Sequence, residues 1–142
     1  MKQIKHLLIL MTLIFGLTAC ATDGQKLEDT PKDGVEVLYF HGKQRCATCQ
    51  AIEKETKALI DSQFADAVKS GKVRFRVVDI TKAEYEALAD KYEITWSSLV
   101  IVKYNNGKET SENLTQFAFA NARSNPAQFK KELAAKINQM LK

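Results

Sequence analysis

The chain has 142 residues, with 21 lysines and arginines against 17 aspartates and glutamates, and a formal net charge of +4. Lys2 and Lys5 are the charged residues of the apolar N-terminal segment that ends at position 20. Residues 20–142 therefore carry a net charge of +2, which is dispersed along the predicted helices. No basic patch with interleaved aromatic residues is found, which argues against a nucleic-acid partner. Residues 20–142 are numerous enough for one domain with a buried core.

The first 20 residues are similar to a bacterial lipoprotein signal peptide. A positive start precedes residues 7–17, an apolar run of 11 residues that is too short to span a membrane comfortably. The sequence LTAC at 17–20 resembles the lipobox, which implies that residues 1–19 are removed and that Cys20 is lipidated. The resemblance predicts a lipoprotein anchored in a bacterial cell envelope, facing the periplasm or the cell surface, with residues 20–33 as a flexible tether. The alternative is a plain signal peptide or a signal anchor with an incidental cysteine.

Two cysteines follow the first predicted strand of the domain. Residues 35–40 (VEVLYF) are apolar at nearly every position, which predicts a central strand buried on both faces. The motif from Cys46 to Cys49 opens a stretch with helical spacing, residues 50–69. Cys46 is expected at the helix N-terminus, where free N–H groups and the positive end of the helix dipole favour a thiolate. We therefore predict that Cys46 is the nucleophile and that Cys49, on the inner helix face, is the resolving thiol.

The rest of the chain alternates strands and helices, in the expected order β-α-β-α-β-β-α. The first helix is expected to end at Ser70-Gly71, with Val68 among its inward residues. Residues 114–121 are expected to pack as core or to cover a sheet edge, or else to form part of a docking surface. The remaining predictions are strands at 73–80, 98–104 and 109–114 with an Asn-Gly turn before the last, a helix at 82–92 capped by Thr81, and a final helix reaching Lys142 capped by Asn125.

This element order, with a CxxC pair after the first strand, resembles the thioredoxin fold over residues 34–142. The resemblance implies an α/β three-layer domain with a central mixed sheet of about four strands flanked by helices. Residues 92–100 are similar to the thioredoxin segment that ends in a cis-proline, and Ser98, or Ser97, stands at the proline position. In that family the proline packs beside the CxxC pair and shapes substrate binding, so its absence puts exchange with arbitrary proteins in doubt. Phe40 stands where thioredoxin has a buried acid.

Residues 39–53 (YFHGKQRCATCQAIE) carry a narrower resemblance. They look like the small lipoprotein-like thioredoxin relatives that are linked to arsenic-resistance operons. Those relatives are described as a nitrophenyl compound nitroreductase subunit, and the resemblance implies a related role here.

Further residues are candidates to support the cysteine pair, in addition to the serine at the proline position. Arg45 places a cation beside Cys46 and is expected to lower the pKa of its thiol. His41 is either a proton donor or acceptor for the thiols or a packed, half-exposed loop residue. Glu53 is either a solvated helix residue or a proton relay. Trp96 forms either an apolar rim for a partner or part of the packing.

Three functional classes fit the cysteine pair. The first is a membrane-tethered thiol-disulfide oxidoreductase or electron-transfer protein whose partner is a protein thiol or disulfide. The second is a protein that binds or transfers a soft metal or metalloid, such as copper(I) or arsenite. The third is a non-catalytic thioredoxin-like partner subunit. The first is preferred over an inert staple, because a disulfide across two intervening residues closes almost no loop and adds little stability.

A structural zinc site is not expected. The chain has three cysteines, of which Cys20 is assigned to the anchor, and its two histidines are His6 in the signal and His41. We expect no resident metal, no other cofactor and a monomer.

Overall fold

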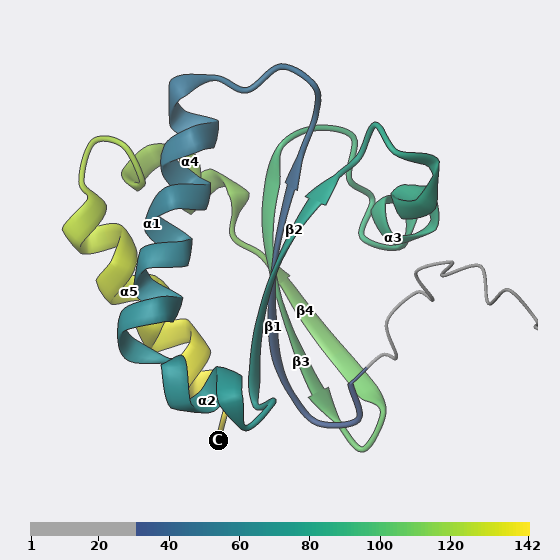
Figure 1. Cartoon of the computed structure of the whole chain (residues 1–142), viewed down its shortest axis with the longest axis vertical. Helices are drawn as coiled ribbons and strands as arrows, with labels where there is room; N and C mark the ends of the chain where they lie inside the picture. Colours follow the sequence, from purple (N-terminus) through teal and green to yellow (C-terminus); the bar gives the residue numbers. More distant parts are fainter. Residues whose placement is uncertain (1–30) are drawn as a thin grey trace, which may run out of the picture.

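A mixed sheet of four strands, in the order β2-β1-β3-β4, runs through the computed structural model, which describes residues 31–142 (Figure 1). β1 (Gly34–His41) pairs in parallel with β2 (Val73–Asp79) and antiparallel with β3 (Ser98–Asn105). β3 continues through an Asn-Gly turn into β4 (Lys108–Asn113), its antiparallel neighbour. The four strands predicted from the sequence are thus confirmed, with ends that differ by one residue at most.

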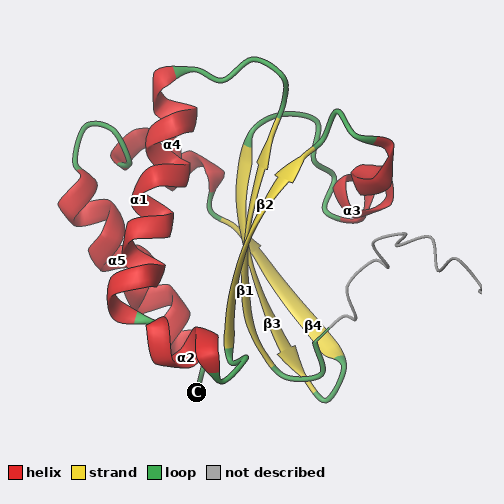
Figure 2. Cartoon of the chain, viewed as in Figure 1, coloured by secondary structure: helices red, strands yellow, loops and turns green. Residues whose placement is uncertain are grey.

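Helices cover both faces of the sheet (Figure 2). One face carries α1 (Ala47–Gln63), α2 (Ala65–Lys69), α4 (Thr115–Asn121) and α5 (Pro126–Met140). The other face carries the short α3 (Glu86–Lys91), which follows a 3-10 turn, η1 (Ala83–Tyr85). This arrangement is the three-layer α/β architecture that the sequence predicts.

β1 lies at the centre of the sheet and supplies both halves of the core. Every residue from 35 to 40 is at most 3% exposed. Val37 and Tyr39 pack toward α1 and α5, whereas Leu38 and Phe40 pack toward α3. Burial of each such side chain stabilises the fold by roughly 1.5–3 kcal/mol. Since β1 ends just before the cysteine pair, the most deeply buried strand of the domain also positions the loop that carries the cysteines.

One charged residue interrupts the apolar centre of β1. Glu36 is 3% exposed, and its carboxylate lies 3.1 Å from Nε of Arg76. The hydroxyl of Tyr104 donates a hydrogen bond of 3.2 Å to the same carboxylate. A buried carboxylate needs such partners, because an unpaired charge in the interior is strongly destabilising.

The predicted single helix over residues 50–69 is wrong, since α1 begins at Ala47 and ends at Gln63 and a separate α2 follows. The break lies at Phe64, whose backbone leaves the helical region with φ −121° and ψ 14°. The turn at Phe64 lets its side chain pack into the core at 5% exposure, while Val68 is 42% exposed instead of facing inward.

Two further expectations are corrected. Thr81 does not cap a helix, because its hydroxyl and N–H both donate to Asp79, and the chain enters η1 at Lys82 without a side-chain cap. Residues 115–121 form α4, a helix that the sequence does not predict. Its first residue is tied to the sheet, because Thr115 Oγ1 accepts a hydrogen bond of 3.1 Å from the Leu99 N–H.

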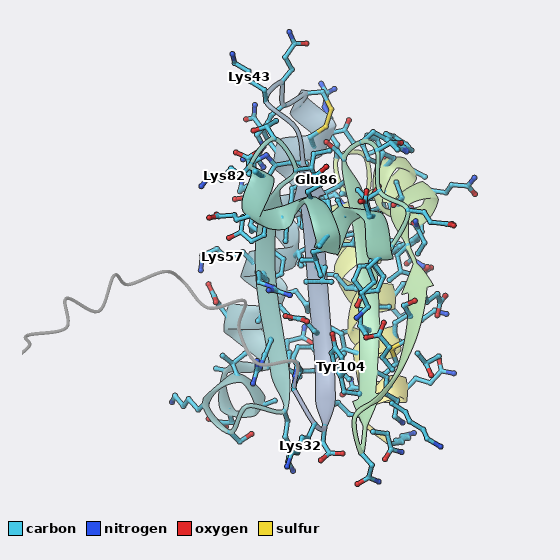
Figure 3. The ribbon with its side chains drawn as sticks, turned by 90° about the vertical axis from the view of Figure 1, so that its right-hand side faces the viewer. Lys32, Lys43, Lys57, Lys82, Glu86 and Tyr104 are labelled. Atoms are coloured by element: carbon cyan, nitrogen blue, oxygen red, sulfur yellow. A yellow bond between two sulfur atoms is a disulfide. The ribbon has the colours of Figure 1, made fainter. Side chains whose placement is uncertain are left out.

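The chain joins the domain at the end of the sheet opposite the cysteines. The carbonyl of Lys32 accepts a bond of 2.9 Å from the Gly107 N–H, and Asp33 accepts one of 2.9 Å from the Asn106 N–H. Figure 3 shows Lys32 at this end and Lys43 at the other, near the disulfide. Among the described residues, no helix has the length and apolar character needed to cross a membrane. The predicted signal, Cys20 and the tether up to residue 30 lie outside the described residues.

Candidate active site

A disulfide joins Cys46 and Cys49 in the loop and first turn between β1 and α1, with Cα atoms 5.1 Å apart. Cys46 is the N-cap residue of α1, with extended backbone angles of φ −68° and ψ 164°. Its Sγ accepts a hydrogen bond of 3.1 Å from the Cys49 N–H, one of the helix-start donors that have no partner within the helix. The predicted position of Cys46 at the helix N-terminus is therefore confirmed.

The two sulfurs differ in exposure. Cys46 is exposed, whereas Cys49 is 6% exposed and lies on the inner face of α1. An incoming thiol or disulfide therefore reaches Cys46 first. This is the order of access that the predicted nucleophile and resolving thiol require, and the roles themselves stay predictions.

Tyr39 lies beneath the cysteine pair. Its side chain is fully buried, and its hydroxyl donates a hydrogen bond of 2.8 Å to the carbonyl oxygen of Cys49. Burial raises the pKa of Tyr39 above its ordinary value, although Arg45 and Ser97 oppose this effect. Tyr39 is thus a neutral hydrogen-bond donor where thiols titrate, and it ties the first turn of α1 to the end of β1.

Arg45 is held by contacts on three sides. Its guanidinium forms an ion pair with Glu53 and lies over the ring of Tyr39, with Cζ 5.8 Å from the ring centre. Its carbonyl accepts a bond of 3.2 Å from the side chain of Gln50. Burial alone would lower the pKa of Arg45, but the interactions with Glu53 and Tyr39 outweigh it and raise the pKa. The cation predicted beside Cys46 is present, but a carboxylate accompanies it.

The loop before β3 and the first residue of β3 contribute an exposed aromatic residue and two buried serines. Ser98 is 2% exposed, pairs with Phe40 across the sheet and donates a bond of 3.0 Å to the Trp96 carbonyl. Every peptide bond in the described part of the chain is trans. Trp96 is 57% exposed and rests against Phe119 of α4, with ring centres 5.3 Å apart. Trp96 is therefore a surface residue at the disulfide end of β3, not part of the core.

His41 is the last residue of β1 and is half-buried. Its Nδ1 lies 3.0 Å from the Gly42 carbonyl oxygen, and its neighbour across the parallel register is Asp79. Hydrogen bonds from Thr81 lower the pKa of the Asp79 carboxyl, and His41 adds to the effect. The described residues show no hydrogen bond between His41 and either cysteine. This placement fits the packed, half-exposed interpretation better than a direct proton exchange with the thiols.

The sequence does not predict the roles that two residues of this site have in the structure. In the sequence, Tyr39 is one of several large residues in a buried strand. The feature that could have indicated its role is its hydroxyl group, at the strand end nearest the cysteines. The sequence suggests a solvated residue or a proton relay for Glu53, whereas the structure pairs it with Arg45. The eight-residue spacing of that pair crosses a loop-to-helix boundary, so no helical spacing rule predicts it.

No protein-family model and no curated protein matches this chain. Solved structures do match it. A thioredoxin from Malassezia sympodialis, Mala s 13, aligns with a TM-score of 0.50 and 22% identity over 80% of this chain and 80% of that one. A thioredoxin from Fasciola hepatica aligns with a TM-score of 0.48 and 23% identity over 77% and 83%. A thioredoxin from Thermus thermophilus aligns with a TM-score of 0.45 and 16% identity over 72% of this chain and 72% of that one.

At these identities the likeness concerns the fold. Together with the strand order and the two helical layers, it shows that the domain has a thioredoxin-like α/β fold. The CxxC pair lies at the start of α1, directly after the loop that follows β1, as the sequence predicts.

Proposed function

We propose that this chain is a membrane-tethered thiol-disulfide oxidoreductase that exchanges electrons with a protein thiol or disulfide. One observation carries the proposal: an exposed N-cap cysteine is bonded to a buried cysteine one turn later, in the strand-to-helix loop of a thioredoxin-like fold. A staple would gain little at this spacing, whereas a redox pair needs one accessible and one protected sulfur.

The exchange conserves electrons and protons between the two partners. A thiolate of a partner dithiol attacks Sγ of Cys46, the Cys46–Cys49 bond breaks, and Cys49 leaves as a thiolate that takes up a proton. The second partner thiol loses its proton and attacks the partner sulfur of the mixed disulfide, which releases Cys46. Cys46 is released as a thiolate, so the partner is oxidised to a disulfide while this chain gains two electrons and the one proton on Cys49. The reverse sequence oxidises the chain and reduces a partner disulfide.

The helix start favours the thiolate that these steps need. α1 has 17 residues, and its positive end and free N–H groups face Cys46. The Cys49 N–H already donates to the Cys46 sulfur in the disulfide and would donate more strongly to a thiolate. Such surroundings lower a thiol pKa from about 8.5 into the range of roughly 3.5–7.5.

The tether is the second part of the proposal, and the sequence alone supports it. Lipidation of Cys20 would hold the domain at a membrane of the bacterial envelope, outside the reducing cytoplasm, where a CxxC pair can cycle. The narrower resemblance of residues 39–53 extends the proposal to the arsenic-operon-associated relatives. A redox-inactive variant with both Cys46 and Cys49 replaced by serine would test that extension, because nitrophenyl reduction by host cells should then fall.

Trapping of mixed disulfides tests the central proposal. Cys49→Ser in the full-length chain should accumulate partner adducts through Cys46, because no resolving thiol remains, and dithiothreitol should release them. Cys46→Ser is the matched control and should trap few adducts. Equal trapping by both variants, or none by either, would contradict the proposed roles.

The soft-metal hypothesis is separated by a different measurement. Within residues 31–142 no group of three or more His, Cys, Asp or Glu side chains could hold a metal ion, so such binding would depend on the two thiols. Stoichiometric retention of copper(I) or arsenite by the reduced chain, together with failure to trap any partner, would favour that class over exchange.

A further inference from the structure

The ion pair between Arg45 and Glu53 lies beside the cysteine pair and has no part in the steps described above. Arg45 directly precedes Cys46, and the side chains of Arg45 and Glu53 are 29% and 30% exposed. The hydrogen-bond partner of the Cys46 sulfur in the described residues is the Cys49 N–H, not the guanidinium. The arginine nearest to the nucleophile in the chain is therefore engaged by a carboxylate.

We propose that Glu53 is a positioning residue for the thiol chemistry: its carboxylate binds Arg45 and withholds that cation from the Cys46 thiolate. This inference rests on the proposed function, because it concerns the reactivity of the same cysteine. Glu53 acts through Arg45, and it thereby limits how far the site favours the thiolate.

The surroundings of Arg45 allow its charge to be redirected. Its Nε is buried and has no hydrogen-bond partner among the described residues, so the guanidinium holds a spare donor. The ring of Tyr39 supports the guanidinium from below, and the bond from Gln50 fixes the backbone of the loop. When the Glu53 carboxylate is neutralised, these contacts remain. The thiolate of Cys46, the next residue in the chain, is then an anionic acceptor for which the freed guanidinium no longer competes with a carboxylate.

Other charged groups at this end of the domain lie on neighbouring elements. The loop before Cys46 carries Lys43, which is exposed, the ends of β1 and β2 carry His41 and Asp79, and the exposed Lys82 follows β2. The loop at 95–97 and the whole of α4 contain no charged residue. The Arg45–Glu53 pair is thus the partly buried charge system closest in sequence to the nucleophile, and partly buried charges are screened less than exposed ones.

The expected size of the effect follows from simple electrostatics. A neutralised pair acts weakly on a nearby thiolate, whereas a lone guanidinium lowers the thiol pKa, here by about one unit. Below the pKa of Cys46 this gives about tenfold more thiolate, but intrinsic nucleophilicity falls about threefold because it declines with pKa. Alkylation should therefore be about threefold faster at acidic pH and about threefold slower at alkaline pH. Above the pKa, the tenfold change in stability of the reduced form raises the reduction potential by about 30 mV.

The test is the pH profile of Cys46 alkylation in the reduced full-length chain in detergent. Iodoacetamide rates are measured from about pH 4 to about pH 9, with peptide mass analysis to assign the label. Glu53→Gln should move the profile to lower pH. Its alkylation rate should exceed that of the wild type at acidic pH and fall below it at alkaline pH. Glu55→Gln is the matched control, because Glu55 lies on the same helix but pairs with Lys130 at 3.1 Å. Its profile should coincide with that of the wild type.

Three more variants make the test specific to the pair. Arg45→Gln should raise the pKa of Cys46, since it leaves the Glu53 carboxylate alone. The double variant R45Q/E53Q should return close to the wild-type profile, because it removes both charges. Glu53→Asp keeps the charge and should also stay close to the wild type, which guards against an effect of misfolding.

Several results would overturn the inference. These are a Glu53→Gln profile that coincides with the wild type or moves to higher pH, and a double variant that keeps the Glu53→Gln shift. The assay uses a small reagent and a reduced chain, so it needs no partner. A failure of mixed-disulfide trapping would contradict the proposed function. The alkylation profile would still test the role of Glu53 by itself.

Discussion

The hydrogen bond from Tyr39 to Cys49 gives a direct measure of how firmly the sheet holds the redox loop. Tyr39→Phe removes the hydroxyl and keeps the buried ring, including its contact with Arg45. A buried hydrogen bond between neutral groups contributes about 1 kcal/mol to stability. The Cys49 carbonyl is not left unpaired, because it also accepts the helical N–H four residues on. We therefore expect a loss of about 1 kcal/mol, or about 4 °C in Tm for a domain of this size.

Urea and thermal unfolding of the oxidised chain measure this loss. Tyr85→Phe is the matched control, because Tyr85 is half-buried and its hydroxyl makes no hydrogen bond among the described residues. Its stability should change by less than about 0.5 kcal/mol. If Tyr39→Phe and Tyr85→Phe unfold at the same urea concentration, the bond does not hold the loop and the reasoning is wrong.

Two other predictions concern the anchor and the alkaline limit of the fold. Cys20→Ser should release the protein from membranes or block its maturation. A variant that fractionates with membranes and migrates on a gel like the wild type would contradict the prediction of a lipoprotein. Burial, followed by contacts with Tyr92 and Glu36, raises the pKa of Tyr104. The unfolded chain ionises its tyrosines at about pH 10, so stability from this shift is complete below that pH and declines above it. Unfolding in urea at rising pH should show a shallower decline for Tyr104→Phe than for the wild type.

The sheet and the place of the cysteines are predictable because they depend on strong local patterns. Residues 35–40 are buried on both faces of the sheet, and a run of apolar residues is the direct signature of such a strand. The Asn-Gly turn needs left-handed backbone angles, and Asn106 and Gly107 have φ values of 51° and 76°. Asn125 caps α5 by accepting a bond from the Gln128 N–H, as its position before Pro126 predicts.

The elements that sequence patterns fail to predict depend on tertiary contacts. α4 is seven residues long and contains two phenylalanines, so its composition does not favour a helix over a strand. It is held by packing against α1 and α5 and by the bond between Thr115 and Leu99. Phe64 ends α1 because its side chain packs into the core, which no local cap or proline signals. The Arg45–Glu53 pair likewise exists only after the loop has folded onto the helix.

Among the described residues, the buried carboxylate of the central strand lies far from the disulfide. Phe40, at the position that the sequence matches to the buried acid of thioredoxin, is fully buried and packs toward α3, and the buried carboxylate of β1 belongs to Glu36. Glu36 lies four residues earlier on the strand, about 13 Å away along β1, and is already bonded to Arg76 and Tyr104. The neutral hydroxyl of Tyr39 donates its proton to the backbone carbonyl of Cys49, not to the sulfur. We therefore expect no proton relay from Glu36 to the thiols, and we expect the acidity of Cys46 to depend on the charges at the helix start, where the Arg45–Glu53 pair lies.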